Sequence, residues 1–169
     1  MVPVLILIDV QNNMLLPPEP VPSAATVAPA IETVLSRARA AGAPVVHVRN
    51  NGTDDDPDVP GTPGWALVHD VLPGEHVVDK TTPDSFAGTP LSTLVPAGAP
   101  LVVAGMQSDF CVRATTLEAL RRGHPVTLVT DAHATYDGSV PAAEASAAVA
   151  AELAAAGASL TSSEVVHFG

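Results

Sequence analysis

The only cysteine of the chain, Cys111, stands where an apolar run gives way to a helical pattern. Residues 101–104 predict a buried strand, Gly105 interrupts it, and helical spacing then continues from Asp109 to Gly123. The unpaired N–H groups and the dipole of a helix start favour an anion, so we expect the Cys111 thiol to ionise easily. A lone cysteine can equally be a small core residue, and a nearby base and cation would decide between the two.

Asp9 and Lys80 are the candidates for that base and that cation, because each ends a predicted strand. Ligands of parallel α/β sheets bind beyond the carboxyl ends of the strands, so the fold would bring Asp9, Lys80 and Cys111 to one edge. A carboxylate with a raised pKa can take the thiol proton, and a lysine can stabilise the resulting anions. Backbone N–H groups of Gln107 and Cys111 could form an oxyanion hole. Taken singly, Asp9 could cap a loop and Lys80 could be a solvated surface charge.

The elements that must position these residues alternate along the chain. Strands are predicted over residues 4–10, 44–48, 76–79, 101–104 and 125–130, with a short last strand from residue 160. Helices are predicted from Ser23 to Gly42, over 65–71, from Thr89, from Asp109 and over 141–156. This alternation predicts a parallel sheet with helices on both faces, in one domain over residues 1–169.

The composition excludes several classes of function. The formal net charge is −11 with only 7 Lys and Arg, so nucleic-acid binding is not expected. No apolar segment reaches the length of a membrane span. A single cysteine excludes an internal disulfide and fits a reducing cytoplasm, where we expect the protein to act. The long acidic loop over 50–64 is expected to be a lid or a pocket wall.

Three motifs together resemble those of the isochorismatase-like cysteine hydrolases. They are Leu-Ile-Asp-Val-Gln-Asn at 7–12, Val-Asp-Lys at 78–80 with Ser-Phe at 85–86, and Gly-Met-Gln-Ser-Asp-Phe-Cys-Val at 105–112. The resemblance implies a three-layer α/β/α sandwich with a mostly parallel, doubly wound sheet in Rossmann-like strand order. It also implies a catalytic triad on Asp9, Lys80 and Cys111, and a cis peptide between Met106 and Gln107.

We therefore expect a hydrolase that cleaves an amide, ureide or lactam C–N bond of a small molecule through an acyl-enzyme on Cys111. Two alternatives stay open: a catalytically silent binding protein on the same fold, and an ester or vinyl-ether hydrolase. The resemblance disfavours isochorismate hydrolysis, because true isochorismatases lack the cysteine. As the family commonly forms dimers or tetramers, we expect a homo-oligomer.

No metal or cofactor is expected. Nicotinamidases of this family carry an Asp-x-His metal motif after the second strand, where this chain reads Arg-Asn-Asn-Gly at 49–52. The six histidines are scattered without metal-ligand spacing. Substrate-binding candidates are the polar and aromatic residues of loops at the expected sheet edge, although any of them could be ordinary packing. They are Gln11, Asn50, Trp65, Phe86, Phe110 and Tyr136.

Overall fold

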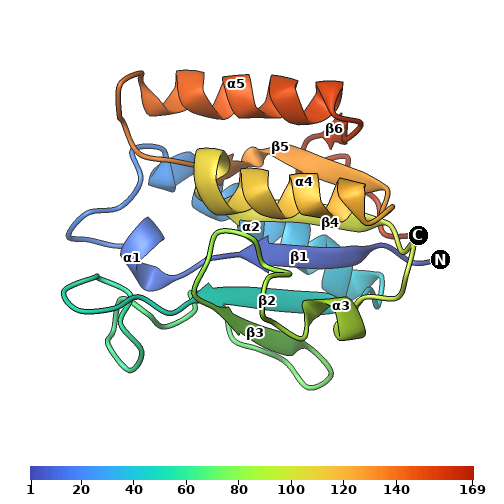
Figure 1. Cartoon of the computed structure of the whole chain (residues 1–169), viewed down its shortest axis with the longest axis horizontal. Helices are drawn as coiled ribbons and strands as arrows, with labels where there is room; N and C mark the ends of the chain where they lie inside the picture. Colours follow the sequence, from blue (N-terminus) through green and yellow to red (C-terminus); the bar gives the residue numbers. More distant parts are fainter.

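A computed structural model describes all residues from 1 to 169 and shows a six-stranded parallel sheet (Figure 1). The strands are β1 (Val4–Ile8), β2 (Val45–Asn50), β3 (His76–Lys80), β4 (Leu101–Met106), β5 (Val126–Ala134) and β6 (Ser159–Thr161). Their order in the sheet is β3-β2-β1-β4-β5-β6, and every neighbouring pair is parallel. Strand order reverses between β1 and β4, as in a doubly wound Rossmann-like sheet, so the predicted fold class is confirmed.

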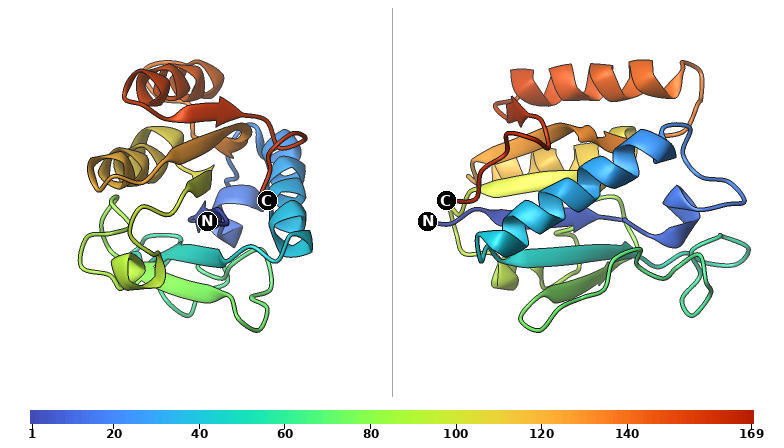
Figure 2. Two further views of the ribbon diagram at one scale, coloured as in Figure 1. Left: turned by 90° about the vertical axis from the view of Figure 1, so that its right-hand side faces the viewer. Right: turned by 180° about the vertical axis from the view of Figure 1, so that it is seen from behind.

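Helices cover both faces of this sheet, which gives three layers (Figure 2). The helices are α1 (Asn12–Leu15), α2 (Ala24–Ala40), α3 (Leu91–Leu94), α4 (Arg113–Arg121) and α5 (Ala142–Ala155). A short π-helical segment, Ser108–Val112, leads directly into α4. Helix α2 packs on one face, and α3, α4 and α5 pack on the other. No helix is long and apolar enough to cross a membrane.

The apolar run of β1 serves two cores at once. Leu5 and Leu7 belong to the buried cluster on the α2 side, whereas Val4, Ile6 and Ile8 belong to the cluster on the α4 and α5 side. Successive side chains of a strand point to opposite faces, and helices cover both faces here, so no position of β1 can be polar. The strand's continuous apolar pattern follows from this central place in the sheet.

Gly105 continues strand β4 instead of ending it, so the expected interruption of the strand is wrong. Its backbone has φ +124°, and a Cβ atom there would lie 2.0 Å from the carbonyl oxygen of Ile8 on the neighbouring strand β1. A glycine is needed because the two backbones approach so closely. The strand then runs on to Met106.

Two segments between the main elements also differ from what the sequence predicts. Residues 65–71, expected as a short helix, are irregular, since Leu67 pairs with Gln11 in an antiparallel bridge and the Val68 N–H donates to Val10 O. The segment after β1, where the sequence predicts no helix, contains helix α1, whose Met14 and Leu15 side chains are buried. In both cases contacts between distant segments decide the local structure, and a local sequence pattern cannot show them.

Candidate active site

Asp9, Lys80 and Cys111 meet beyond the carboxyl ends of the strands. These ends point to the left in Figure 1. The Lys80 ammonium Nζ lies 3.0 Å from Oδ2 of Asp9 and donates to Sγ of Cys111 at 3.2 Å. Asp9 and Lys80 are 1% and 2% exposed, so the ion pair is shielded from water. The structure therefore brings together the three residues that the sequence placed at strand ends.

Each of the three residues is held by its own element. Asp9 leaves β1 with φ +51°, a left-handed conformation that aspartate adopts more readily than most residues, and its N–H donates to Val48 O at 2.9 Å. Lys80 closes β3, two strands away, and its long side chain reaches across the end of β2. Cys111 lies in the π-helical segment directly after β4.

The charges of this cluster are strongly coupled. Burial raises the pKa of the Asp9 carboxyl, although the Lys80 ammonium opposes that rise. Burial alone would lower the pKa of Lys80, but the neighbouring Asp9 and Cys111 outweigh it and raise that pKa. Lys80 is thus held as a cation between two acidic groups.

The expectation of an easily ionised thiol is wrong for this structure. Burial, followed by the Asp9 carboxylate, raises the pKa of Cys111 to about 12, and the Lys80 ammonium offsets only part of that rise. The helix start favours a thiolate, but burial and the Asp9 carboxylate override it. The resting cluster therefore holds a protonated thiol beside an ion pair.

Asn50 connects the cluster to the acidic loop over 50–64. Its Oδ1 accepts a hydrogen bond from Lys80 Nζ at 3.2 Å, and its Nδ2 donates to Oδ2 of Asp58 at 2.7 Å. Asp58 is only 6% exposed, and a Cβ atom on Gly52 would lie 2.1 Å from its Oδ1. The loop therefore packs a buried carboxylate next to the ion pair, and this is possible because residue 52 is glycine.

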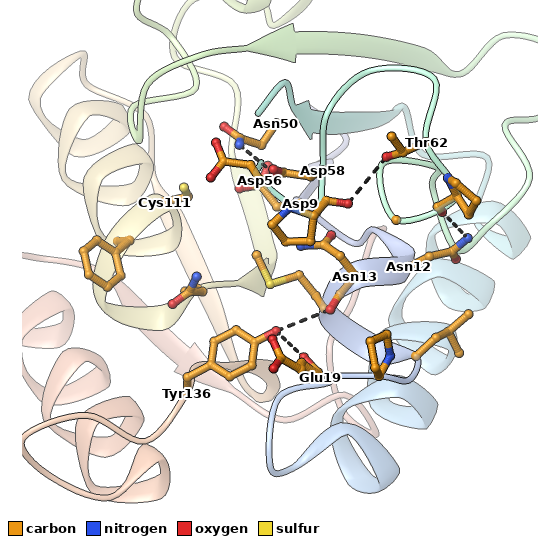
Figure 3. Close-up of a pocket in the computed structure, with 18 of the residues that line it drawn as sticks. Asp9, Asn12, Asn13, Glu19, Asn50, Asp56, Asp58, Thr62, Cys111 and Tyr136 are labelled. Atoms are coloured by element: carbon orange, nitrogen blue, oxygen red, sulfur yellow. Dashed lines mark hydrogen bonds between the residues drawn. The ribbon is translucent and has the colours of Figure 1, made fainter. Parts of the chain in front are cut away.

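A pocket of about 990 Å³ opens above Cys111 (Figure 3). Among the residues predicted from sequence, those that line it are Asp9, Asn50, Gln107, Phe110, Cys111 and Tyr136. The acidic loop contributes a wall with Asp56, Asp58 and Thr62, which agrees with its predicted role as a pocket wall. The opposite wall comes from the segment around α1, where the Tyr136 hydroxyl donates to Glu19 O at 2.8 Å.

Gln11 does not line the pocket but clamps the residues that do. It is fully buried, and its Nε2 donates to the carbonyl oxygens of Asn50 and Trp65, each at 3.0 Å. Its Oε1 accepts from the Asn50 N–H at 2.9 Å. Gln11 therefore fixes the backbone of Asn50, and with it the amide that faces Lys80.

Trp65 and Phe86 also lie outside the pocket lining. The Trp65 indole N–H donates to Oδ1 of Asn51 at 2.8 Å, and the Arg49 guanidinium stacks 3.6 Å from its ring centroid. Phe86 is 4% exposed in the core and stacks on His124. The structure gives these two aromatic residues packing roles, the alternative that the sequence left open.

The turn before Cys111 presents backbone groups to the pocket. The Met106–Gln107 peptide is cis, as expected. The Gln107 carbonyl accepts from the N–H groups of Phe110 and Val112, whereas the Gln107 N–H donates no hydrogen bond within the chain. That N–H is therefore available to an acceptor in the pocket.

A buried polar cluster behind this turn was not predicted. The Ser108 hydroxyl lies 2.8 Å from Nδ1 of His133 and 2.9 Å from the hydroxyl of Ser146. Burial lowers the pKa of His133 to about 4, so its imidazole is neutral. These residues are 25 and 38 positions from Ser108, and no local signal in the sequence connects them. The cluster ties the π-helical segment to β5 and α5.

Residues that could hold a metal ion are not gathered anywhere in the structure. No group of three or more His, Cys, Asp and Glu side chains has a suitable arrangement. His47 pairs with Glu75, and His124 contacts Ala99 O, so each serves a local contact.

The chain matches known proteins along most of its length. Residues 3–165 match the model of the isochorismatase domain. Two streptothricin hydrolases from Streptomyces noursei are 48% and 50% identical to it over 143 residues, which is 82% of this chain. These matches cover 51% and 56% of the relatives, so the chain spans about half the length of the curated relatives it matches.

Solved structures show the same fold. An isochorismatase from Pseudomonas putida superposes with a TM-score of 0.90 at 31% identity, covering 96% of this chain and 89% of that one. An N-carbamoylsarcosine amidase from Thermoplasma acidophilum superposes with a TM-score of 0.85 at 25% identity, covering 98% and 99%. Together with the match over residues 3–165, these likenesses show that the chain belongs to the isochorismatase-like family.

Proposed function

We propose that the protein hydrolyses a C–N bond of a small molecule through a covalent intermediate on Cys111. The observation that carries this proposal is the position of Lys80 Nζ, 3.0 Å from Asp9 and 3.2 Å from the Cys111 sulfur, two residues that line the pocket. A nucleophile, a base and a cation within hydrogen-bond reach of one another are the parts that covalent acyl transfer requires.

The proposed reaction starts with transfer of the thiol proton from Cys111 to the Asp9 carboxylate. The thiolate attacks the carbonyl carbon, and the tetrahedral intermediate collapses as Asp9 returns the proton to the departing amine or ammonia. A water molecule then gives a proton to Asp9 and attacks the thioester. Collapse of the second intermediate releases the carboxylic acid and reprotonates the Cys111 sulfur. The sum is an amide and water converted to an acid and an amine.

The developing oxyanion needs donors that are in place before the reaction. The Gln107 N–H, which has no acceptor within the chain, is one donor, and the Cys111 N–H is the expected second. Lys80 keeps the cluster from carrying two uncompensated negative charges while the proton moves. These roles assign Asp9, Lys80 and Cys111 to catalysis and Gln107 to oxyanion binding.

The relatives suggest which C–N bond to test first. Two similar proteins are streptothricin hydrolases, and a third, from Arthrobacter, is an N-carbamoylsarcosine amidase that is 29% identical over 145 residues. We propose a lactam as the first substrate class, followed by ureides and linear amides. Esters and vinyl ethers belong in the same screen, because their cleavage would identify the non-amide alternative.

Substitution of Cys111 tests the covalent mechanism. Cys111→Ala should abolish hydrolysis while the thermal unfolding curve stays close to that of the wild type, because residues of a catalytic triad act as a unit. Mass spectrometry of the wild type quenched during turnover should find the acyl group on Cys111. Hydrolysis by Cys111→Ala at the wild-type rate would refute the covalent mechanism. Binding of the substrates without turnover by the wild type would instead identify a catalytically silent binding protein.

Several expectations about the whole protein stay predictions. We propose that residues 1–169 act as one hydrolase domain, without a cofactor, in the cytoplasm and as a homo-oligomer. Size-exclusion chromatography with light scattering measures the assembly state directly. A monomer that is fully active would contradict the expected dimer or tetramer.

A further inference from the structure

The positive charges of this protein are placed away from its pocket. Six of the seven Lys and Arg residues are arginines with partners elsewhere, and only Lys80 contacts residues that line the pocket, namely Asp9 and Cys111. Arg39, Arg49, Arg113, Arg121 and Arg122 pair with carboxylates, and Arg37 donates to Glu164 O. None of the residues that line the pocket is a lysine, an arginine or a histidine.

Four carboxylates, in contrast, line this pocket: Asp9, Glu19, Asp56 and Asp58. Lys80 compensates one of them, and its ammonium is in contact with Asp9. Asp58 accepts from Asn50 and Asp56 accepts from the Thr53 N–H, but these donors are neutral. No side chain donates to the Glu19 carboxylate, and the Tyr136 hydroxyl donates to the backbone oxygen of that residue instead. The pocket therefore carries about three uncompensated negative charges on its walls.

The pocket also contains oxygen atoms that lack a donor. Oδ1 of Asp9 and Oδ1 of Asn13 are buried atoms that accept no hydrogen bond from a nitrogen or hydroxyl donor of the chain, although the Cys111 thiol adjoins the Asp9 carboxylate. Both residues line the pocket. Buried acceptors without a donor are costly, and a ligand rich in N–H groups would satisfy them.

We propose that the pocket selects substrates that carry a positive charge, an ammonium or guanidinium group, in addition to the C–N bond that is cleaved. The walls formed by Glu19 and Asp56 attract this group, and the interior charge at Asp58 adds to the field. Clefts lined by charges of one sign concentrate ligands of the opposite sign and repel ligands of the same sign. Anionic amides are therefore poor substrates of this site.

The rates at which charged reagents label Cys111, the only cysteine, measure the electrostatic field in the pocket and do not require turnover. The probes are two methanethiosulfonates, one with a trimethylammonium group and one with a sulfonate group, and each rate with Cys111 is divided by its rate with mercaptoethanol. Three charges acting over several ångströms should favour the cationic probe on the order of tenfold at low ionic strength. The preference should shrink toward one in about 1 M salt, where the Debye length is about 3 Å.

Isosteric substitutions locate the source of the preference. The double variant Glu19→Gln, Asp56→Asn should lower the cationic preference several-fold, because it removes two wall charges without changing side-chain volume. Glu32→Gln, on the exposed side of α2, is the matched control and should leave the preference unchanged. A wild-type preference of one or less, or an unchanged preference in the double variant, would overturn the proposal.

Three amides of equal length extend the test to catalysis: δ-aminovaleramide, valeramide and glutaramate, which are cationic, neutral and anionic. Ammonia release should give kcat/KM values in that order, with the order weakened in the double variant. This substrate arm rests on the proposed function, whereas the labelling arm does not. If none of the three amides is cleaved, the proposed C–N hydrolysis is contradicted, and the labelling rates still test the charge selection. If glutaramate is cleaved fastest, the charge selection is contradicted.

Discussion

Replacement of Asp9 by asparagine should change turnover and thiol reactivity in opposite directions. The substitution keeps the shape of the side chain, and asparagine tolerates the left-handed backbone that residue 9 adopts, with φ +51°. It removes the base that accepts the thiol proton, so hydrolysis should be lost. It also removes the negative charge that helps to keep the Cys111 thiol protonated, so alkylation of the thiol should become faster.

The size of the second effect follows from the distances to Lys80. A unit charge 3.2 Å from the Lys80 ammonium gains about 5 kcal/mol at an effective dielectric constant of about 20, which corresponds to roughly four pKa units. In the wild type the same ammonium also pairs with the Asp9 carboxylate at 3.0 Å, so it stabilises the Cys111 thiolate by only part of this energy. Because burial persists in the variant, we expect about half of that amount, a fall of roughly two pKa units from about 12.

The expected alkylation rate combines two opposing factors. A fall of about two pKa units raises the thiolate fraction at pH 8 about 100-fold, since this pH lies below both pKa values. A less basic thiolate is a weaker nucleophile, with a Brønsted coefficient of about 0.4–0.5, and a fall of about two pKa units therefore lowers the rate constant of the thiolate nearly tenfold. The net expectation is alkylation of Asp9→Asn by iodoacetamide about tenfold faster than that of the wild type.

The assay is the rate of iodoacetamide alkylation, followed by mass spectrometry, as a function of pH. The wild-type rate should rise with pH and reach no plateau until the pH approaches about 12, whereas Asp9→Asn should level off earlier. Asp79→Asn removes an exposed carboxylate beside Lys80 in sequence and is the control, expected to match the wild type. Slower or unchanged alkylation of Asp9→Asn would refute the inference that Asp9 holds the thiol proton.

The remaining predictions concern stability and metal dependence. Gly105→Ala should lower the free energy of unfolding by about 2 kcal/mol or more, because the new Cβ would meet Ile8 O, and thermal unfolding measures this loss. Gly157→Ala is the control, because Gly157 also has a positive φ, +115°, but has open space around it, so its variant suffers backbone strain without a collision. Ser108→Ala should cost about 1–3 kcal/mol in chemical denaturation, since the buried His133 Nδ1 loses its partner, and an unchanged midpoint would contradict this. Hydrolysis should survive dialysis against EDTA, because no set of ligands for a metal is assembled; loss of activity that zinc restores would show otherwise.

The sequence predicted the positions of Asp9, Lys80 and Cys111 well because their location depends on topology alone. Each ends or follows a strand, and the carboxyl ends of parallel strands meet at one edge of the sheet. The roles of Gln11, Trp65 and Phe86 depended instead on which way a side chain points. A loop position near the edge does not show whether a side chain lines the pocket or packs beneath it.

The pKa of Cys111 shows a second limit of local reasoning. The helix start after β4 is visible in the sequence and favours a thiolate. The depth of burial is not visible, and neither is the strength of the effect of the Asp9 carboxylate, although the topology predicts its position; together they raise the pKa to about 12. An electrostatic prediction from sequence is therefore least secure where the fold gathers several charges, which is also where chemistry takes place.

A high resting pKa is compatible with a nucleophilic Cys111 in the proposed mechanism, because the thiol does not ionise into water. The proton passes to Asp9, whose own pKa burial raises, so the negative charge moves from one buried group to the other. The Lys80 ammonium lies 3.0 Å from the first and 3.2 Å from the second, and compensates the charge equally well before and after the transfer. The net charge of the cluster stays constant, and because burial raises the pKa of both groups, the step is opposed by the difference between the two pKa values and not by the full rise in the pKa of the thiol. Lys80→Met should therefore abolish hydrolysis and also lower the thermal unfolding temperature, since without the ammonium neither location of the buried charge is stabilised.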